Sequence, residues 1–510
     1  MVMYLYGAAV QGIQSFIFQT NKLREIVGAS ELVEEICTSK FYEILTGTKV
    51  PFEDAQEKLK ADKNAILHAA GNIKYIFDSK EECEKIVREF PKAIFEFAPG
   101  VTVSQAVVKM EEDYEGFKPA VNELEKRLRT QRNKPMRSAT LGLMGIERSR
   151  QTGLPVVLEK NDEYYDAGTR SKLFEDTTGQ LRRTTKKLCK IAFAKSEIYD
   201  RQIAYDIEDM TQQNDWIAII HADGNGLGQI VQAVGTDKDK FKYFSENLDK
   251  ATKTAAVNAY NVVKKQFNED KFIPIRPIVL GGDDFTTICR ADIALDYVTA
   301  FIDNFEKETT FIKDFRSDGL QFDNLTACAG IAYIKSSFPF YYGYELAEAL
   351  CSEAKKDAKD KLKDGESAKS CLMFHKVQDS FTEDWSDIAK RELTPQENIS
   401  FQFGPYYINE KKEECRWTVK DLTVASKKLE GKEGNAVKSH LRQWMSQLHD
   451  NPGMAQQKLL RLESMTTNND LFNLIKKVTF EYKNKDELYK SPVYDILAIH
   501  TINNQETKEF

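Results

Sequence analysis

Two short motifs in the middle of the chain combine carboxylates with glycines. In the first, Asp223 ends an apolar run and precedes the loop Gly224-Asn225-Gly226-Leu227-Gly228. In the second, an apolar segment leads into Gly281-Gly282-Asp283-Asp284, as expected at the tip of a hairpin. Carboxylates held close together repel one another, and a divalent cation relieves that repulsion. Ligand sets made only of oxygen favour Mg²⁺ or Mn²⁺ over zinc.

The glycines add a second requirement of the same chemistry. Without side chains, Gly224, Gly226 and Gly228 leave room for a triphosphate to approach backbone N–H groups where the chain enters a helix. Two metal ions about 3.5–4 Å apart would activate an attacking hydroxyl and stabilise the departing pyrophosphate. Either motif alone is a common turn, but both together, each at the end of an apolar strand, favour a nucleotidyl-transfer site.

Two lysines form a third candidate element. The helix expected over 344–359 has a core stripe at 347, 351, 354 and 358, and Lys355 and Lys359 lie four residues apart on an adjoining face. Lysines beside an apolar stripe are usually solvated. This helix, however, follows the fourth strand of its block, a position from which Lys355 can reach the phosphates.

The block 206–378 supplies the elements that must position these residues. Its patterns predict strands at 216–222, 275–281, 285–290 and 326–334, helices at 241–267, 291–308 and 344–359, and a final strand at 371–377. The order β-α-β-β-α-β is that of a ferredoxin-like unit. In that unit the first strand neighbours the hairpin, so we expect Asp223, Asp283 and Asp284 to converge on one edge.

The block 1–110 repeats this order, which indicates an internal duplication. The predicted fold class is α+β, with two ferredoxin-like domains in one chain. Residues 111–205 are expected to form a connector, whose basic run is either a solvated face or a phosphate or RNA contact: Arg127, Arg129, Arg132, Lys134 and Arg137. Residues 379–510 are expected to form a mostly helical closing domain, with helices at 419–447, 455–463 and 468–480.

Composition narrows the class without naming the function. The 510 residues suggest about three domains, and 72 basic against 79 acidic residues give a net charge of −7. No global cationic field exists to hold duplex nucleic acid. Eight dispersed cysteines without a CxxC pair argue against a zinc ribbon and a disulfide framework. The uncharged start, 1–21, lacks the basic region of a signal peptide, and no run is long enough to span a membrane, so we expect a cytoplasmic protein.

At these residues the sequence resembles the palm-domain polymerase–cyclase family. The nearer resemblance is to the CRISPR polymerases, the large subunits of type III CRISPR effector complexes, and the more distant one is to GGDEF diguanylate cyclases. The shared features are the Asp223-Gly224 loop, the Gly-Gly-Asp-Asp hairpin at 281–284, the pair Ala354-Lys355, and a first-palm stretch from Val10-Gln11-Gly12 to Gly28-Ala29-Ser30. They cover about the first three quarters of the chain, and 379–510 matches only by position.

The resemblance implies two palms that bind two ATP molecules and join them into cyclic oligoadenylate. Carried over by residue, Asp223, Asp283 and Asp284 would hold metal, Lys355 would contact the triphosphate, and the loop 224–228 would cradle the phosphates. Ser30 of the first palm would touch a nucleotide. The first palm's hairpin, 69–72, reads Ala-Ala-Gly-Asn without an acidic residue, so it would bind ATP but hold no catalytic metal.

Several positions depart from the family. Asn225 stands where the loop often has a second acid, which implies that one metal is held less tightly. The segment 147–155 resembles a zinc-binding segment without its cysteines, so no zinc is expected. The first palm begins at residue 1, and the only His-Asp dipeptide, His449-Asp450, looks like a helix end, so no nuclease domain is expected. Leu227, Gly228 and Val231 replace the cyclases' guanine-reading pattern, which favours adenine.

The main hypothesis is therefore a metal-dependent nucleotidyltransferase that makes an adenylate signal in CRISPR-type antiviral defence. With both palms in one chain, it requires no homodimer. One rival is a scaffold subunit, with a regulatory ATP pocket, that binds guide or target RNA and other effector subunits. Another is a transferase that joins AMP to a non-nucleotide acceptor. The absence of nuclease and zinc elements favours a reduced or stand-alone relative, and no membrane contact is expected.

Overall fold

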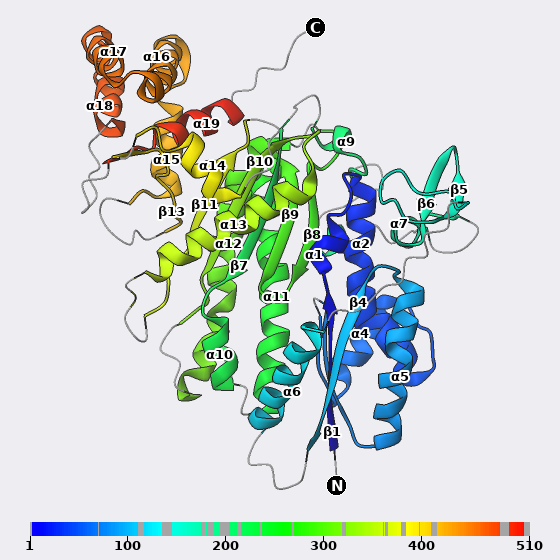
Figure 1. Cartoon of the computed structure of the whole chain (residues 1–510). Helices are drawn as coiled ribbons and strands as arrows, with labels where there is room; N and C mark the ends of the chain where they lie inside the picture. Colours follow the sequence, from blue (N-terminus) through cyan, green and yellow to red (C-terminus); the bar gives the residue numbers. More distant parts are fainter. Residues whose placement is uncertain are drawn as a thin grey trace.

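The computed structural model describes most of the chain (Figure 1). The described residues are 3–69, 71–110, 117–134, 145–174, 179–181, 187–193, 203–211, 216–234, 237–267, 270–318, 323–360, 362, 366–378, 384–396, 398–409, 416–479 and 489–503.

The first palm has the predicted strand order. Its sheet contains β1 (Met3–Gln11), β2 (Ala65–Ala69), β3 (Asn72–Phe77) and β4 (Thr102–Met110), arranged β2-β3-β1-β4 with antiparallel neighbours. This is the arrangement of a ferredoxin-like unit.

Helices cover both faces of this first sheet. They are α1 (Ile13–Ile17), α2 (Leu23–Glu35), the π-helix η1 (Ile36–Lys40), α3 (Phe41–Thr46), α4 (Phe52–Ala61), α5 (Lys80–Phe97) and α6 (Phe117–Arg132). Tyr6 stacks on Phe41 of α3, whereas Gly7, on the opposite face of β1, lies against Leu124 of α6.

Helix α6 therefore packs as part of the first palm, although the sequence suggested a connector from residue 111. It carries Arg127, Arg129 and Arg132 of the basic run. Arg127 contacts Glu123 at 2.8 Å and donates to the carbonyl of Val107. This arginine is thus held by the palm itself, and Arg137 lies outside the described residues.

The second palm contains the larger sheet. Its strands are β7 (Trp216–Gly224), β8 (Ile275–Gly281), β9 (Asp284–Arg290), β10 (Ala327–Lys335), β11 (Cys371–Lys376) and β13 (Tyr406–Tyr407), in the order β13-β11-β10-β7-β9-β8. The four strands β8, β9, β7 and β10 reproduce the ferredoxin-like order. Strand β11 adds to them in parallel with β10.

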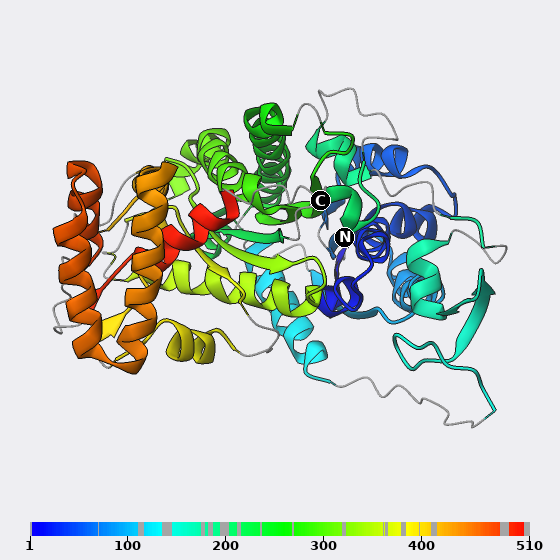
Figure 2. The same ribbon diagram turned by 90° about the horizontal axis from the view of Figure 1, so that it is seen from above.

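Long helices enclose the second sheet. Helices α11 (Lys238–Val263) and α12 (Ala291–Glu308) cover one face, and α13 (Phe340–Lys359) covers the other (Figure 2). The short α10 (Leu227–Val234) follows β7, and the 3₁₀ segments η3 (Lys264–Phe267) and η4 (Thr309–Asp318) continue α11 and α12. Helix α13 starts at Phe340 rather than at 344 as predicted, because Asn21 of the first palm accepts the N–H of Phe340 at 3.0 Å and satisfies the helix end.

The two palms are in direct contact (Figure 1). The hydroxyl of Ser30 in α2 donates to the carbonyl of Ile278 in β8, and both side chain and carbonyl are buried there. Phe18 stacks on Tyr344 of α13 with ring centroids 4.5 Å apart. Lys242 of α11 donates to the carbonyl of Asp62 at 2.6 Å. The first palm thereby braces the strands and helix that carry the second palm's candidate residues.

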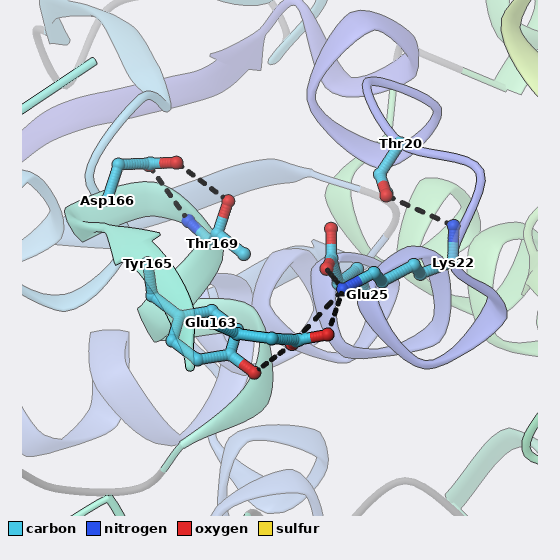
Figure 3. Close-up of polar contacts among 7 residues, drawn as sticks. All are labelled: Thr20, Lys22, Glu25, Glu163, Tyr165, Asp166 and Thr169. Atoms are coloured by element: carbon cyan, nitrogen blue, oxygen red, sulfur yellow. Dashed lines mark hydrogen bonds and ion pairs between the residues drawn. The ribbon is translucent and has the colours of Figure 1, made fainter. Parts of the chain in front are cut away.

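The connector is fastened to the first palm by a polar cluster (Figure 3). It contains β5 (Val156–Lys160), β6 (Glu163–Asp166) and α7 (Ala167–Leu173), followed by α8 (Lys187–Ala192) and α9 (Ile207–Thr211). Glu163 accepts from Lys22 at the start of α2 at 3.2 Å and also from the hydroxyl of Tyr165. Asp166 caps α7 by accepting the N–H groups of Gly168 and Thr169.

The C-terminal part is mostly helical, as expected. Its elements are α14 (Trp385–Glu392), β12 (Ile399–Ser400), α15 (Val419–Lys427), α16 (Gly431–Asp450), α17 (Pro452–Met465), α18 (Asn469–Val478), β14 (Tyr489–Lys490) and α19 (Val493–Asn503). The single helix predicted over 419–447 is wrong, because the chain turns at Gly431, whose φ is 82°, and starts a second helix. The predicted helix end at His449-Asp450 is confirmed.

This part is also joined to the second palm. Strand β13 pairs with β11 and extends the palm's sheet, and the hydroxyl of Tyr406 in β13 donates to Asp495 of α19 at 2.6 Å. Across the described residues, no helix has the length and apolar character needed to cross a bilayer.

The buried carboxyl of Asp495 generates a stability prediction. Burial raises the pKa of Asp495 to about 7, far above the value near 4 of an unfolded aspartate. Between those values the folded state binds the extra proton, so this group's contribution to stability falls as pH rises from about 4 to 7. Asp495→Asn should therefore raise the free energy of unfolding by about 1–3 kcal/mol at pH 8 and leave it nearly unchanged at pH 4.5. Chemical denaturation at both pH values, with the exposed Asp450→Asn as control, checks this, and an equal gain at both values would contradict it.

Candidate functional site

The three aspartates meet at one edge of the second sheet, as predicted. Asp223 at the end of β7 is paired in register with Asp284 at the start of β9. Asp283 occupies the hairpin between β8 and β9, where Gly281 pairs with Asp284. Antiparallel pairing places the end of one strand beside the start of the next, so carboxylates about 60 residues apart in sequence become neighbours.

Two glycines make this close approach possible. Gly282 has a φ of 62°, a left-handed conformation that side chains disfavour, and so the hairpin turns tightly before Asp283. A Cβ at Gly224 would lie 2.6 Å from Leu227 and 3.2 Å from the Cβ of Asp283. The loop after β7 and the hairpin thus pack against each other through a position that accommodates no side chain.

Mutual repulsion and burial raise the pKa values of two of the three aspartates. Burial, the negative charge of Asp223 and a hydrogen bond with it raise the pKa of Asp283 to about 7. Burial, followed by the charges of Asp283 and Asp223, raises the pKa of Asp284 to about 7 as well. The Oδ1 atom of Asp284 is buried and has no hydrogen-bond partner among the described residues. The site therefore favours binding of positive charge, whether a proton or a cation.

Lys355 supplies the compensating charge. Its ammonium forms an ion pair with Asp223 and donates to the carbonyl of Gly224 at 3.0 Å. A cavity of about 480 Å³ opens beside these groups, and its lining includes the residues of both motifs and both lysines: Asp223, Gly224, Asn225, Gly226, Leu227, Gly228, Asp283, Lys355 and Lys359. Lys355 therefore lies beside the loop, and Lys359 lines the same cavity one helical turn further on.

Asn225 faces the interior of the sheet. Its side-chain amide donates to the hydroxyl of Thr326 at 3.1 Å and to the thiol of Cys328 at 3.3 Å, while its backbone N–H donates to the carbonyl of Thr326 at 2.8 Å. Cys328 lies 3.7 Å from Cys371 of β11. In this arrangement the side-chain amide of Asn225 fixes the loop to Thr326 and to Cys328 of β10, while the loop as a whole lines the cavity.

Two residues of the site were missed by the sequence interpretation. His221 lies 3.6 Å from Asp284 and 3.2 Å from the hydroxyl of Thr286, and burial lowers its pKa to about 4. Glu348 of α13 adds negative charge that raises the pKa of Asp284. Their spacing contained a usable signal. His221 is two residues before Asp223 on one strand face, and Glu348 is seven before Lys355, about two helical turns.

The first palm borders the hairpin that carries Asp283 with a hydroxyl group and acidic side chains. The hydroxyl of Ser30, expected to touch a nucleotide, donates its proton to the carbonyl of Ile278 between the palms, so only its oxygen lone pairs are left for a nucleotide while that bond is made. A Cβ at Gly281 would lie 3.6 Å from a carboxylate oxygen of Asp249 in α11 and 4.0 Å from one of Glu34 in α2. Acidic side chains therefore lie next to the hairpin on the side of the first palm.

Within the described part of the chain, no three His, Cys, Asp or Glu side chains are arranged as a ready-made set of metal ligands. At the candidate site this agrees with the contacts above, since Asp223 is engaged by Lys355 and by Asp283. The donors nevertheless suit a hard divalent cation, because they are carboxylate oxygens, and two of them bind protons unusually tightly.

The anchoring role of Asn225 is testable. Asn225→Ala removes the side-chain hydrogen bonds to Thr326 and to Cys328 of β10, and we expect a loss of about 1–2 kcal/mol in the free energy of unfolding together with weaker nucleotide binding. Gln229→Ala, an exposed residue that lines the same cavity, serves as the control and should change neither quantity. Chemical denaturation and a nucleotide titration measure the two effects. Wild-type stability in Asn225→Ala would show that the contacts to Thr326 and Cys328 do not hold the loop.

Comparison with known proteins finds similarity to a family over the second palm. Residues 216–363 match the family model of the Cas10/Cmr2 second palm domain. No curated protein matches the sequence.

Solved structures agree over a longer stretch. A chain of the Csm1–Csm4 cassette in complex with cA3 is 15% identical with a TM-score of 0.56, and the match covers 98% of this chain and 69% of that one. For the cassette in complex with one ATP, the identity is 14%, the TM-score 0.51, and the coverage 98% and 70%. For the Csm1–Csm4 subcomplex in the type III-A CRISPR-Csm interference complex, the identity is 13% and the TM-score is 0.50, and the match covers 98% of this chain and 70% of that one. At such identities the likeness establishes a shared fold. The family match covers the second palm, and the solved structures share the fold of nearly the whole chain.

Proposed function

We propose that the chain is a nucleotidyltransferase that joins ATP molecules into cyclic oligoadenylate or a related adenylate signal. The observation that carries this proposal is the convergence of Asp223, Asp283 and Asp284 beside Lys355 and a glycine loop, at the mouth of a cavity of about 480 Å³. Carboxylates suited to divalent cations and a loop suited to phosphates are the two requirements of phosphoryl-group chemistry.

In the proposed reaction, the 3′-hydroxyl oxygen of one ATP bonds to the α-phosphorus of another. The bond from that phosphorus to the bridging oxygen of the pyrophosphate breaks, pyrophosphate leaves with the bond's electron pair, and the hydroxyl proton passes to solvent. Asp223, Asp283 and Asp284 would hold Mg²⁺ or Mn²⁺, which lowers the pKa of the hydroxyl and neutralises charge on the phosphates.

The chain's other residues bind and orient the substrate. Lys355, next to Gly224, lies where its ammonium can attract the phosphates while it holds Asp223 in place. The backbone of the loop 224–228 lines the cavity at the start of α10, where N–H groups without helical partners suit an anion. Asn225 positions this loop through β10.

The comparisons support the choice of adenylate chemistry. Structures of the same fold are complexes with cA3, with pppApApA and with one ATP. The departures from the cyclase pattern at Leu227, Gly228 and Val231 favour adenine over guanine in this chain. The second palm lies against the first within one polypeptide, so a homodimer is not needed to complete the site.

A second role has its own supporting observation. One matching structure is a Csm1–Csm4 subcomplex of a type III-A interference complex. The chain would then also serve as a subunit of an RNA-guided effector complex, with ATP binding as part of its regulation. The two roles are compatible, and the experiment below separates synthesis from scaffolding.

We expect Asp283→Ala/Asp284→Ala to lower product formation by about a hundredfold or more without loss of fold, because it removes two of the three carboxylates that would hold the cation. Purified wild type and variant are incubated with ATP and Mg²⁺ or Mn²⁺, alone and with single-stranded RNA, and the products are analysed by mass spectrometry. Glu89→Ala/Glu433→Ala, which removes two exposed carboxylates outside the site, should behave as wild type.

The products distinguish the alternatives. An oligoadenylate made only by wild type and the control supports the proposal. A conjugate of AMP with another molecule would instead indicate a transferase that joins AMP to a non-nucleotide acceptor. Equal product from the Asp283/Asp284 variant would refute the site. Absence of product from wild type under every condition, including reconstitution with effector subunits, would leave scaffolding as the function.

A further inference from the structure

A second cavity, unconnected with the carboxylate site, lies where the second palm meets the C-terminal helices. Its volume is about 640 Å³, within the range of small-molecule sites. Residues from the end of β11 and from α14, α16 and α19 line it, and none of them lines the 480 Å³ cavity beside Asp223. This goes beyond the proposed nucleotidyl transfer, because a different set of residues forms it.

The lining is rich in positive charge, although the chain as a whole carries −7. Lys376, Arg391 and Arg442 come from three different elements and face the same space, together with His449. Among the described residues that line it, the only carboxylate is that of Glu392, which is 3.0 Å from Arg391 and 3.4 Å from the buried His375. That carboxylate is thus already engaged away from Lys376 and Arg442.

Lys376 and Arg442 are not neutralised by acidic groups. The ammonium of Lys376 lies 3.9 Å from the ring centroid of Trp216, and Arg442 donates to the hydroxyl of Thr501 at 2.7 Å. Neither forms an ion pair with a carboxylate in the described part of the chain. Burial, then the charges of Arg442 and Lys335, lowers the pKa of Lys376. Cations kept together at this cost attract an anion.

The remaining lining suits a ligand with an apolar body. Met445, Leu497 and Ala498 provide an apolar wall, and Tyr494 presents an aromatic ring. The hydroxyl of Tyr494 accepts from Gln378 at 2.9 Å and the ring stacks on His375, so its position is fixed. A phosphate joined to a ring-bearing nucleoside combines the two properties that the cavity offers, and stacking and charge-assisted hydrogen bonds are its usual recognition modes.

The cavity is also far from the carboxylates along the sheet. In register, Asp223 lies beside Cys328 and Cys371, at the start of β11, whereas Lys376 ends that strand. About five residues of extended chain separate the two ends, roughly 17 Å. A ligand at Lys376 and a nucleotide at Asp223 can therefore be bound at the same time.

We propose that this cavity binds the phosphate of an adenylate-sized nucleotide, free or as part of an RNA strand, between Lys376 and Arg442. The two sources share one chemistry, a phosphate attached to a nucleoside, and the experiment has an arm for each.

The test is hydrogen–deuterium exchange of the full chain, followed in peptides from β11, α16 and α19. The probes are an ATP analogue with a methylene group between the α- and β-phosphates, and a short single-stranded RNA. We expect slower exchange in these peptides with one of the probes. In Lys376→Glu/Arg442→Glu the probe concentration that gives half of the maximal protection should rise about tenfold or more, because two charge-assisted contacts are lost.

The controls keep the result interpretable. Lys390→Glu/Lys432→Glu makes the same change in net charge on exposed positions of α14 and α16 outside the lining, and it should bind as wild type. Asp283→Ala/Asp284→Ala should keep the protection, so failure of the proposed catalysis does not mimic failure of this site. If the charge-reversal variant does not fold, Lys376→Gln/Arg442→Gln replaces it.

Each outcome decides the proposal. Protection by the ATP analogue that is lost only in the Lys376/Arg442 variants assigns the site to free nucleotide, and the same pattern with RNA alone assigns it to the strand. Absence of protection with both probes overturns the proposal. Equal weakening in the Lys390/Lys432 control also overturns it, since the effect would then come from net charge and not from the cavity.

Discussion

Repulsion among the carboxylates at the edge of the second sheet is the constraint on which the rest of the site depends. Strand register fixes Asp223 opposite Asp284, and the hairpin adds Asp283, so the backbone positions that carry these charges cannot move apart without breaking backbone hydrogen bonds. Lys355 offsets part of the charge, and pKa values raised to about 7 for Asp283 and Asp284 show that more positive charge is favoured. The fold therefore holds like charges together at this edge, and the proposed cation site rests on that arrangement.

Packing behind the site resists this repulsion. The loop after Asp223 is held to β10 through Asn225, and α13 carries Lys355 across the face of the sheet. From the other side, α2 of the first palm donates a hydrogen bond from Ser30 to β8, the strand that leads into the hairpin. The first palm is thus a mechanical support for the hairpin as well as the candidate surface for a second nucleotide.

Local patterns in the sequence were sufficient to predict the palms and the convergence of the aspartates. The strand at 275–281 and the helix at 291–308 coincide with β8 and α12, because apolar periodicity and a glycine turn determine both locally. Contacts between segments distant in the sequence could not be predicted from such local patterns. Packing of α6 on β1, the engagement of Ser30 by Ile278 and the inward orientation of Asn225 depend on tertiary neighbours that no local pattern encodes.

The same sheet has opposite charges at its two ends, and under the two proposals an acidic chain would bind one anionic ligand at each end. Beside Asp223, a phosphate is attracted only when a cation or Lys355 offsets the carboxylates, so binding there is coupled to the chemistry. Beside Lys376 and Arg442, the attraction needs no added cation, because the lining already carries excess positive charge. Removal of divalent cations should therefore weaken nucleotide binding at the first end and leave the second end unaffected. A ligand that binds without divalent cations would therefore occupy the cavity at the Lys376 end of β11, away from Asp223.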